Sequence, residues 1–161
     1  MRKSLIFVMA ILFSTLMVIP SFAQGTLKIG APQPMTGPDA PFGSKFQKAY
    51  NLALEEINAK GGVQGKKLEV LIEDHQAKNP LAATVTEKLI TQYNVLALTG
   101  GRASGQAVEI ASVAHRLKTP YVVDHPSADI ITSKGFAWIF RNNPTGSIYP
   151  QAFNKFISEV T

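Results

Sequence analysis

The sequence predicts an α/β fold, a doubly wound parallel sheet with helices on both faces. Short apolar runs alternate with helical patterns along the chain, and glycine or proline separates them. This alternation is typical of parallel strands buried between two layers of helices. We expect five strands, at Leu27 to Ala31, Leu68 to Asp74, Val95 to Thr99, Pro120 to Asp124 and Ala137 to Arg141.

The first helix is expected from Ser44 to about Lys60. Ser44 and Gln47 have the spacing of a capping box, in which the two side chains satisfy free N–H groups at the helix start. Apolar residues recur on one face of this segment, and Gly61 with Gly62 ends it. This segment therefore reads as an amphipathic helix between the first two strands.

Three further helices follow. The second begins at Asn79, a capping residue, with Pro80 at the first helical position, and its core stripe is Ala82, Val85 and Leu89. The third begins near Gly105 and is apolar around much of its circumference, which predicts deep burial. The last runs from Ile148 to Val160, after a turn-rich segment around Pro144.

The first 23 residues have the pattern of an export signal. Arg2 and Lys3 precede an apolar stretch from Leu5 to Ile19, and Ser21-Phe22-Ala23 is a small-x-small site that predicts cleavage before Gln24. A membrane anchor is the alternative, but the apolar stretch is shorter than the ~20 residues that a spanning helix needs. We therefore expect a periplasmic protein with its signal peptide cleaved after Ala23.

Charge and composition exclude several classes of function. Removing the signal leaves 14 basic and 11 acidic residues, a net charge of 14 − 11 = +3, and the basic residues form no dense run for nucleic acid. The absence of cysteine excludes disulfides and thiolate chemistry. His75, His115 and His125 lack metal-ligand spacing, and no nucleophile elbow or phosphate loop occurs. We expect no enzyme, metal or cofactor.

Two segments, Gly30 to Gly43 and Glu55 to Gly65, resemble the opening of the periplasmic leucine/isoleucine/valine-binding protein family. The resemblance implies a type I periplasmic binding protein, two-lobed when full length, that delivers a small molecule to an ABC transporter permease. We expect a monomer. Family members are more than twice as long, so the chain is interpreted as a fragment with the first ligand-binding lobe at residues 24–143 and the start of the second at 144–161.

Ligands in open parallel sheets bind beyond the carboxyl ends of the strands. The expected loops are Pro32 to Gly43, Gly100 to Gly105 and His125 to Asp129. The family resemblance implies that Ser104 and Ser127 hold the carboxylate and ammonium ends of the ligand. As a helix cap, Ser104 would sit beside free N–H groups that favour an anion. The alternative is that Ser104 only caps its helix.

Four more residues complete the expected ligand site: Phe42, Arg102, Ala103 and His125. Phe42 matches an aromatic residue over the ligand in the family, although it could instead fix the start of the first helix. Arg102 and His125 depart from the family pattern and could bind a carboxylate or a phenolate, whereas a loop arginine is commonly solvated. The ligand is therefore left open among an amino acid, an aromatic acid and a dicarboxylate.

Two other functions remain as alternatives. A sensory receptor shares this fold and would carry a membrane span further along the chain. A dinucleotide-binding enzyme is suggested by the glycine-rich loop from Thr99 to Gly105 and by Asp124 at the end of the next strand. That loop lacks the full glycine spacing, which disfavours the enzyme. We expect Asp74 and His75 to have a structural hydrogen-bonding role.

Overall fold

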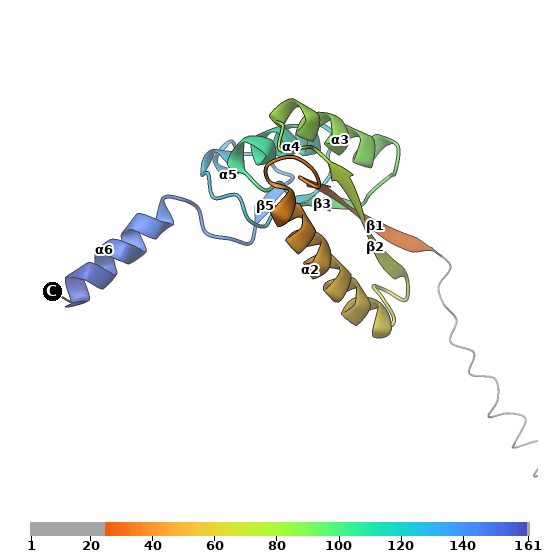
Figure 1. Ribbon diagram of the computed structural model, residues 1–161, viewed down its shortest axis with the longest axis horizontal. Coiled ribbons are helices and arrows are strands. Elements are labelled where there is room, and N and C mark those ends of the chain that lie inside the picture. Colours follow the sequence, from red (N-terminus) through yellow and green to blue (C-terminus); the bar gives the residue numbers. More distant parts are fainter. Residues whose placement is uncertain (1–24, 161) are drawn as a thin grey trace, which may run out of the picture.

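The computed structural model describes residues 25–160, so the predicted signal peptide and its cleavage site lie outside the described residues. Five parallel strands form one sheet in the order β2-β1-β3-β4-β5 (Figure 1). The strands are β1 (Thr26–Gln33), β2 (Lys67–Asp74), β3 (Ala97–Thr99), β4 (Tyr121–Val123) and β5 (Ile139–Arg141). The predicted α/β class is confirmed.

The strand order decides which face each helix covers. The chain moves outward from β1 to β2 and then in the opposite direction from β2 through β3 and β4 to β5. Because crossovers between parallel strands are right-handed, this reversal puts α2 on one face and the later helices on the other (Figure 1). The helices are α2 (Ala40–Ala59), α3 (Asn79–Thr91), α4 (Ser104–Arg116) and α5 (Ile130–Ser133). The sheet is thus doubly wound.

The core lies between the sheet and the α3–α4 pair. The expected stripe of Ala82, Val85 and Leu89 on α3 is buried, and α4 is buried along much of its length. From the sheet, Leu98, Tyr121 and Ile139 face these helices in register across β3, β4 and β5. Because apolar area removed from water contributes roughly 25 cal/mol per Å², this layer holds the lobe together.

The predicted start of the first helix is wrong by four residues. α2 begins at Ala40 after Asp39, and Pro41 lies in its first turn. Proline there loses no needed hydrogen bond and presets the helical dihedral angle, so the helix starts early. Ser44 and Gln47 consequently lie inside the helix, and the predicted capping box does not form.

Two other caps also differ from prediction. Lys78 precedes α3, and the predicted cap Asn79 is the first helical residue, whose Oδ1 accepts a hydrogen bond of 3.0 Å from Gln106 Nε2. Ala103 precedes α4, so Ser104 is not the cap. Strands β3, β4 and β5 are shorter than expected and β1 is longer, while the short α5 was not predicted.

The last helix, α6 (Ile148–Val160), has the predicted bounds and lies apart from the sheet (Figure 1). All of its residues are exposed. Its large apolar residues are Ile148, Tyr149, Phe153, Phe156, Ile157 and Val160. Within residues 25–160, no helix combines the length and apolarity needed to cross a membrane.

Candidate functional site

A pocket of about 230 Å³ opens where β3 and β4 end. Its lining residues are Arg102, Ala103, Ser104, His125, Pro126 and Ser127. Five of these six are residues that the sequence singles out for ligand binding; only Pro126 was not. The loops after two neighbouring strands therefore converge at the edge of the sheet where open parallel sheets bind ligands.

Phe42, the sixth expected residue, adjoins this pocket through Arg102. The guanidinium carbon of Arg102 lies 3.9 Å from the centre of the Phe42 ring, a cation–π contact. The buried Nε of Arg102 has no hydrogen-bond partner within residues 25–160. Arg102 is therefore held against α2 rather than freely solvated. The contact joins the first turn of α2 to the loop after β3, at the point where the strand order reverses between β1 and β3.

His125 is held by two neighbours. Its Nδ1 lies 3.2 Å from the carbonyl oxygen of Arg102, and its ring meets the Phe46 ring edge-on with 5.8 Å between centres. Because a carbonyl only accepts, Nδ1 carries the proton, and Nε2 of the neutral ring is an acceptor. The exposed ring could accept from a ligand hydroxyl or, once protonated, donate to a carboxylate.

Ser104, which was predicted as the cap of this helix, is the first residue of α4, one position after the observed cap Ala103. The Oε1 of Gln106 instead accepts from the backbone N–H of Ala103 at 3.0 Å. The Ser104 hydroxyl accepts a hydrogen bond of 3.3 Å from the backbone N–H of Ala128. Its own proton can still be donated to a ligand, and the first N–H groups of a 13-residue helix lie beside it.

The backbone of the Gly100–Gly101 turn is fixed from two sides. The Tyr121 hydroxyl donates to the Gly100 carbonyl at 2.8 Å, and the Gly101 N–H donates to the Pro32 carbonyl at 3.0 Å. Gly100 has a φ of +104°, and a Cβ there would lie 2.8 Å from the Pro32 oxygen. Glycine is therefore required at this turn.

A polar cluster at the carboxyl ends of β1, β3 and β4 joins Asp124 to residues that the sequence analysis did not single out, Gln33 and Thr99 among them. Gln33 donates from Nε2 to the Tyr50 hydroxyl at 2.7 Å, and the Thr99 hydroxyl lies 3.3 Å from Asp124 Oδ2. Gln33 Oε1 and Asp124 Oδ1 are buried without a partner within residues 25–160. The period-2 alternation of the strands could have shown that Gln33 and Thr99 share the α2 face.

Burial changes the titration of this cluster. Desolvation raises the pKa of Asp124, although hydrogen bonds from its own N–H and from Thr99 work in the other direction. Desolvation and the Asp124 carboxylate together raise the pKa of Tyr50 well above its ordinary value. The buried carboxyl of Asp124 does not suit the ribose contact of the dinucleotide alternative.

Asp74 forms a different, structural arrangement at the end of β2. Its Oδ1 accepts from the N–H groups of Met35, Thr36 and Gln76 at 2.9, 3.2 and 2.8 Å. Partial burial raises the pKa of Asp74, but the hydrogen bond from the Thr36 hydroxyl and those from the backbone outweigh it and lower the pKa. His75 is fully buried, and desolvation lowers its pKa.

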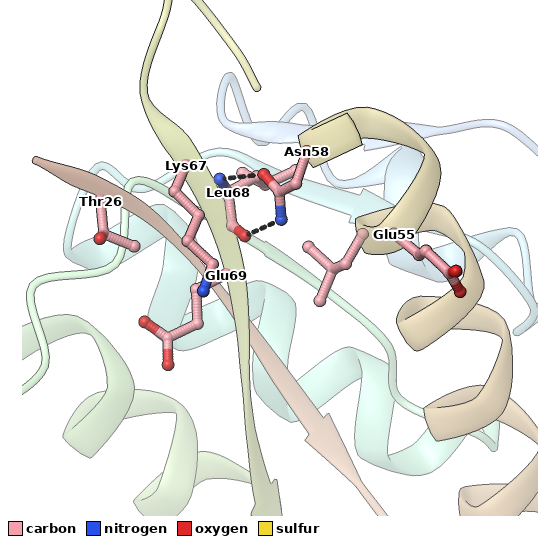
Figure 2. A pocket seen from close by; sticks show the side chains of 7 residues that line it. Thr26, Glu55, Asn58, Lys67, Leu68 and Glu69 are labelled. Atoms are coloured by element: carbon pink, nitrogen blue, oxygen red, sulfur yellow. Dashed lines mark hydrogen bonds between the residues drawn. The ribbon is translucent and has the colours of Figure 1, made fainter. Parts of the chain in front are cut away.

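A second pocket, of about 360 Å³, lies at the opposite end of the sheet (Figure 2). Its lining residues are Thr26, Leu54, Glu55, Asn58, Lys67, Leu68 and Glu69. Asn58 makes two hydrogen bonds to the backbone of Leu68, of 2.9 Å from Nδ2 to the carbonyl and of 2.8 Å from the N–H to Oδ1 (Figure 2). These bonds tie α2 to β2, which is a structural role.

The doubly wound sheet and the pocket at the carboxyl ends of β3 and β4 have the arrangement in which open parallel sheets bind ligands. The chain belongs to the periplasmic binding protein family, whose pattern matches residues 26–160. It is 36% identical over 138 residues to Leu/Ile/Val-binding protein homolog 7 of Brucella abortus (strain 2308), covering 86% of this chain and 33% of that protein. The chain thus spans about a third of the length of the curated relatives it matches.

Two solved structures illustrate the likeness. The branched-chain amino acid transporter substrate-binding protein LivJ from Streptococcus pneumoniae, in complex with isoleucine, has a TM-score of 0.71 and 34% identity over 75% of this chain and 34% of that chain. A solute-binding protein of an ABC transporter from Rhodopseudomonas palustris BisB5, in complex with 3,4-dihydroxybenzoic acid, has a TM-score of 0.67 and 29% identity over 74% and 32%.

Proposed function

We propose that this chain is the first part of an exported solute-binding protein that captures a small carboxylate between two lobes and delivers it to an ABC importer. Residues 24–143 would form the first lobe, and residues 144–161 would begin the second. The protein would act in the periplasm as a monomer without catalytic activity, once its signal peptide has been cleaved after Ala23. The amino acid transporter proteins among the relatives support this proposal.

The observation that carries the proposal is the composition of the pocket at the ends of β3 and β4. No aspartate or glutamate is among its six lining residues, whereas Arg102 and Ser104 can both donate hydrogen bonds. The N-terminus of α4 adds free N–H groups and the positive end of a helix dipole. This half of the site therefore suits an anionic group.

The ligand class remains the one expected from sequence: an amino acid, an aromatic acid or a dicarboxylate. The Phe42 and Phe46 rings that pack against Arg102 and His125 offer an apolar wall for an aromatic ring. His125 Nε2 could accept from a phenol, and Arg102 could grip a second carboxylate. The Rhodopseudomonas protein solved with 3,4-dihydroxybenzoic acid supports the aromatic choice.

The first experiment is native mass spectrometry of the mature full-length protein, which detects ligand retained through purification. A thermal-shift panel of L-leucine, 4-hydroxybenzoate and succinate follows, because a ligand that binds only the native state raises the melting temperature. Retention of a nucleotide, or no response to any carboxylate, would contradict the proposal.

Calorimetry then tests the two proposed ligand contacts, Ser104 and Arg102. Ser104→Ala should weaken binding about tenfold to a hundredfold, as loss of a charge-assisted hydrogen bond does. Ser112→Ala is the matched control, because Ser112 lies on the same helix and donates to the Val108 carbonyl at 2.8 Å. If Ser104→Ala binds as tightly as the parent, the carboxylate anchor is wrong. Arg102→Ala, with Arg116→Ala as its control, tests the second anionic contact.

A further inference from the structure

The loop that contributes His125, Pro126 and Ser127 to the pocket is bound along its whole length by a segment that begins with the last residue of β5. Every residue of the loop, residues 125–129, has a partner in residues 141–147, the stretch that leads from β5 into α6. We call residues 141–147 the link. This continuous pairing means that the position of the loop depends on one later segment of the chain.

Arg141, at the end of β5, makes the central contacts. Its Nη1 donates to the Pro126 carbonyl at 2.5 Å and its Nη2 to the Ala128 carbonyl at 2.8 Å. Its Nε lies 3.4 Å from the Thr132 hydroxyl. A planar guanidinium can span two carbonyls at a fixed separation, which the single ammonium of a lysine cannot do. Arg141 thus sets the spacing of the loop backbone.

Asn143 and Gly146 bind the carbonyls that Arg141 leaves. Asn143 Nδ2 lies 3.1 Å from the carbonyl oxygens of both His125 and Pro126, and the Gly146 N–H donates to the Ser127 carbonyl at 2.7 Å. All four carbonyls from residue 125 to residue 128 therefore accept from the link.

The side chain of Asp129 closes the series. Hydrogen bonds from the Thr145 hydroxyl and from Ser147 lower the pKa of this carboxyl. On its other side the loop reaches the start of α4, where the Ala128 N–H donates to the Ser104 hydroxyl and the His125 ring contacts the Arg102 carbonyl. The loop therefore lies between the link and the proposed carboxylate anchor.

We propose that Arg141 and Asn143 are positioning residues for ligand binding, which hold the 125–129 loop in place and join it to the link. This proposal rests on the proposed function, because it takes that loop as part of the ligand site. Neither residue lines the pocket, so neither needs to touch the ligand. A change in the path of the link would displace His125 and Ser127, and ligand binding would in turn fix the link.

The first test is hydrogen exchange on the full-length protein without ligand. Arg141→Gln removes the guanidinium that spans two carbonyls. Asn143→Asp keeps the shape of the side chain but replaces a hydrogen-bond donor by an acceptor. Both should speed exchange of the Gly146 and Ala128 amides about tenfold or more, while α3 amides stay unchanged. Arg116→Gln is the matched control, since Arg116 pairs with Glu87 on the surface. Unchanged exchange at Gly146 and Ala128 in both variants would overturn the proposal.

The second test measures affinity with L-isoleucine and 4-hydroxybenzoate as probes. Arg141→Gln should weaken binding of the accepted probe on the order of tenfold, as loss of one hydrogen bond to a charged group does. In the double variant with Ser127→Ala, the fold-loss of affinity should be clearly smaller than the product of the two single fold-losses, because both substitutions act through the same loop. General destabilisation would not produce this coupling.

The outcomes separate the two proposals. Faster exchange with unchanged affinity, or strictly multiplicative losses in the double variant, would show that the loop position does not control binding and would overturn the positioning role. If the unmodified protein binds neither of these probes nor succinate, the proposed ligand class fails, and the exchange experiment alone then decides whether the link holds the loop. Should Arg141→Gln fail to fold, Asn143→Asp takes its place in every comparison.

Discussion

Two rows of side chains cross the same three strands, one residue apart, and meet different surroundings. The inner row is Leu98, Tyr121 and Ile139, and the outer row is Thr99, Val122 and Phe140. The inner row is 1%, 0% and 8% exposed, because α3 and α4 cover it, whereas Phe140 in the outer row is 53% exposed. Chain topology, rather than hydropathy, therefore decides which face of this sheet is covered.

The two faces also differ in chemistry. The inner row is apolar apart from the Tyr121 hydroxyl, which donates to the Gly100 carbonyl. The outer face carries Gln33, Thr99 and Asp124 at the carboxyl ends of the strands, and one buried oxygen each of Gln33 and Asp124 has no hydrogen-bond partner within residues 25–160. The inner face therefore provides stability, and the outer face can respond to pH and to whatever covers it.

The largest effect is expected when residues 24–161 are produced alone. Leu96 and Phe140 are 56% and 53% exposed, and the apolar side chains of α6 have water around them. Exposed apolar patches of this kind promote association rather than cooperative folding. We expect no cooperative thermal transition and no measurable affinity for L-leucine or 4-hydroxybenzoate. A sharp transition with saturable binding would contradict this expectation.

In the full-length protein, Leu98→Ala should lower the free energy of unfolding by about 2–5 kcal/mol, because it leaves a cavity in the inner row. The exposed Leu52, at 59% on α2, is the matched control, and Leu52→Ala should change stability by less than about 0.5 kcal/mol. Urea denaturation measures both. Equal losses would mean that the inner row is no more important than the outer surface of α2.

Much of this comparison could be predicted from the sequence, since apolar periodicity located all five strands and the α3 stripe. The caps of α2, α3 and α4 could not, because local propensity competes with contacts made far along the chain. Serine is a preferred cap, yet Ser104 bonds instead to Ala128, 24 residues later, and Ala103 takes the cap position. The strand-end rule and the family resemblance together singled out five of the six pocket residues, whereas the contacts of Arg141 with the 125–129 loop exist only in three dimensions.

Tyr121→Phe should lower the free energy of unfolding by about 1–3 kcal/mol, since it leaves the buried Gly100 carbonyl without its partner. Tyr93→Phe is the control, because Tyr93 is 36% exposed and should be nearly silent. Gly100 begins the loop that leads to Arg102, so ligand affinity should fall as well. A Tyr121→Phe protein with unchanged stability would show that water replaces the hydroxyl.

The smallest expected effect is a pH dependence of stability that has opposite signs at two aspartates, Asp124 and Asp74. Burial raises the pKa of Asp124 in the folded protein, so its stabilising contribution is complete below the unfolded pKa of about 3.9 and is lost as pH rises through the folded pKa. Asp124→Asn removes that loss. We therefore expect this variant to gain melting temperature relative to the parent as pH rises from about 4 to 7.

Asp74 provides the opposite case at the end of β2. Hydrogen bonds lower its pKa, so its contribution is present above the unfolded pKa and is lost as pH falls through the folded pKa. Asp74→Asn should therefore be less stable than the parent at pH 7, with the gap closing in acid. Melting curves of both variants across pH 3 to 7 test the pair. If Asp124→Asn follows the same trend as Asp74→Asn, the Asp124 carboxyl is not desolvated in solution, and the outer face is wetter at its carboxyl edge than its buried oxygens indicate.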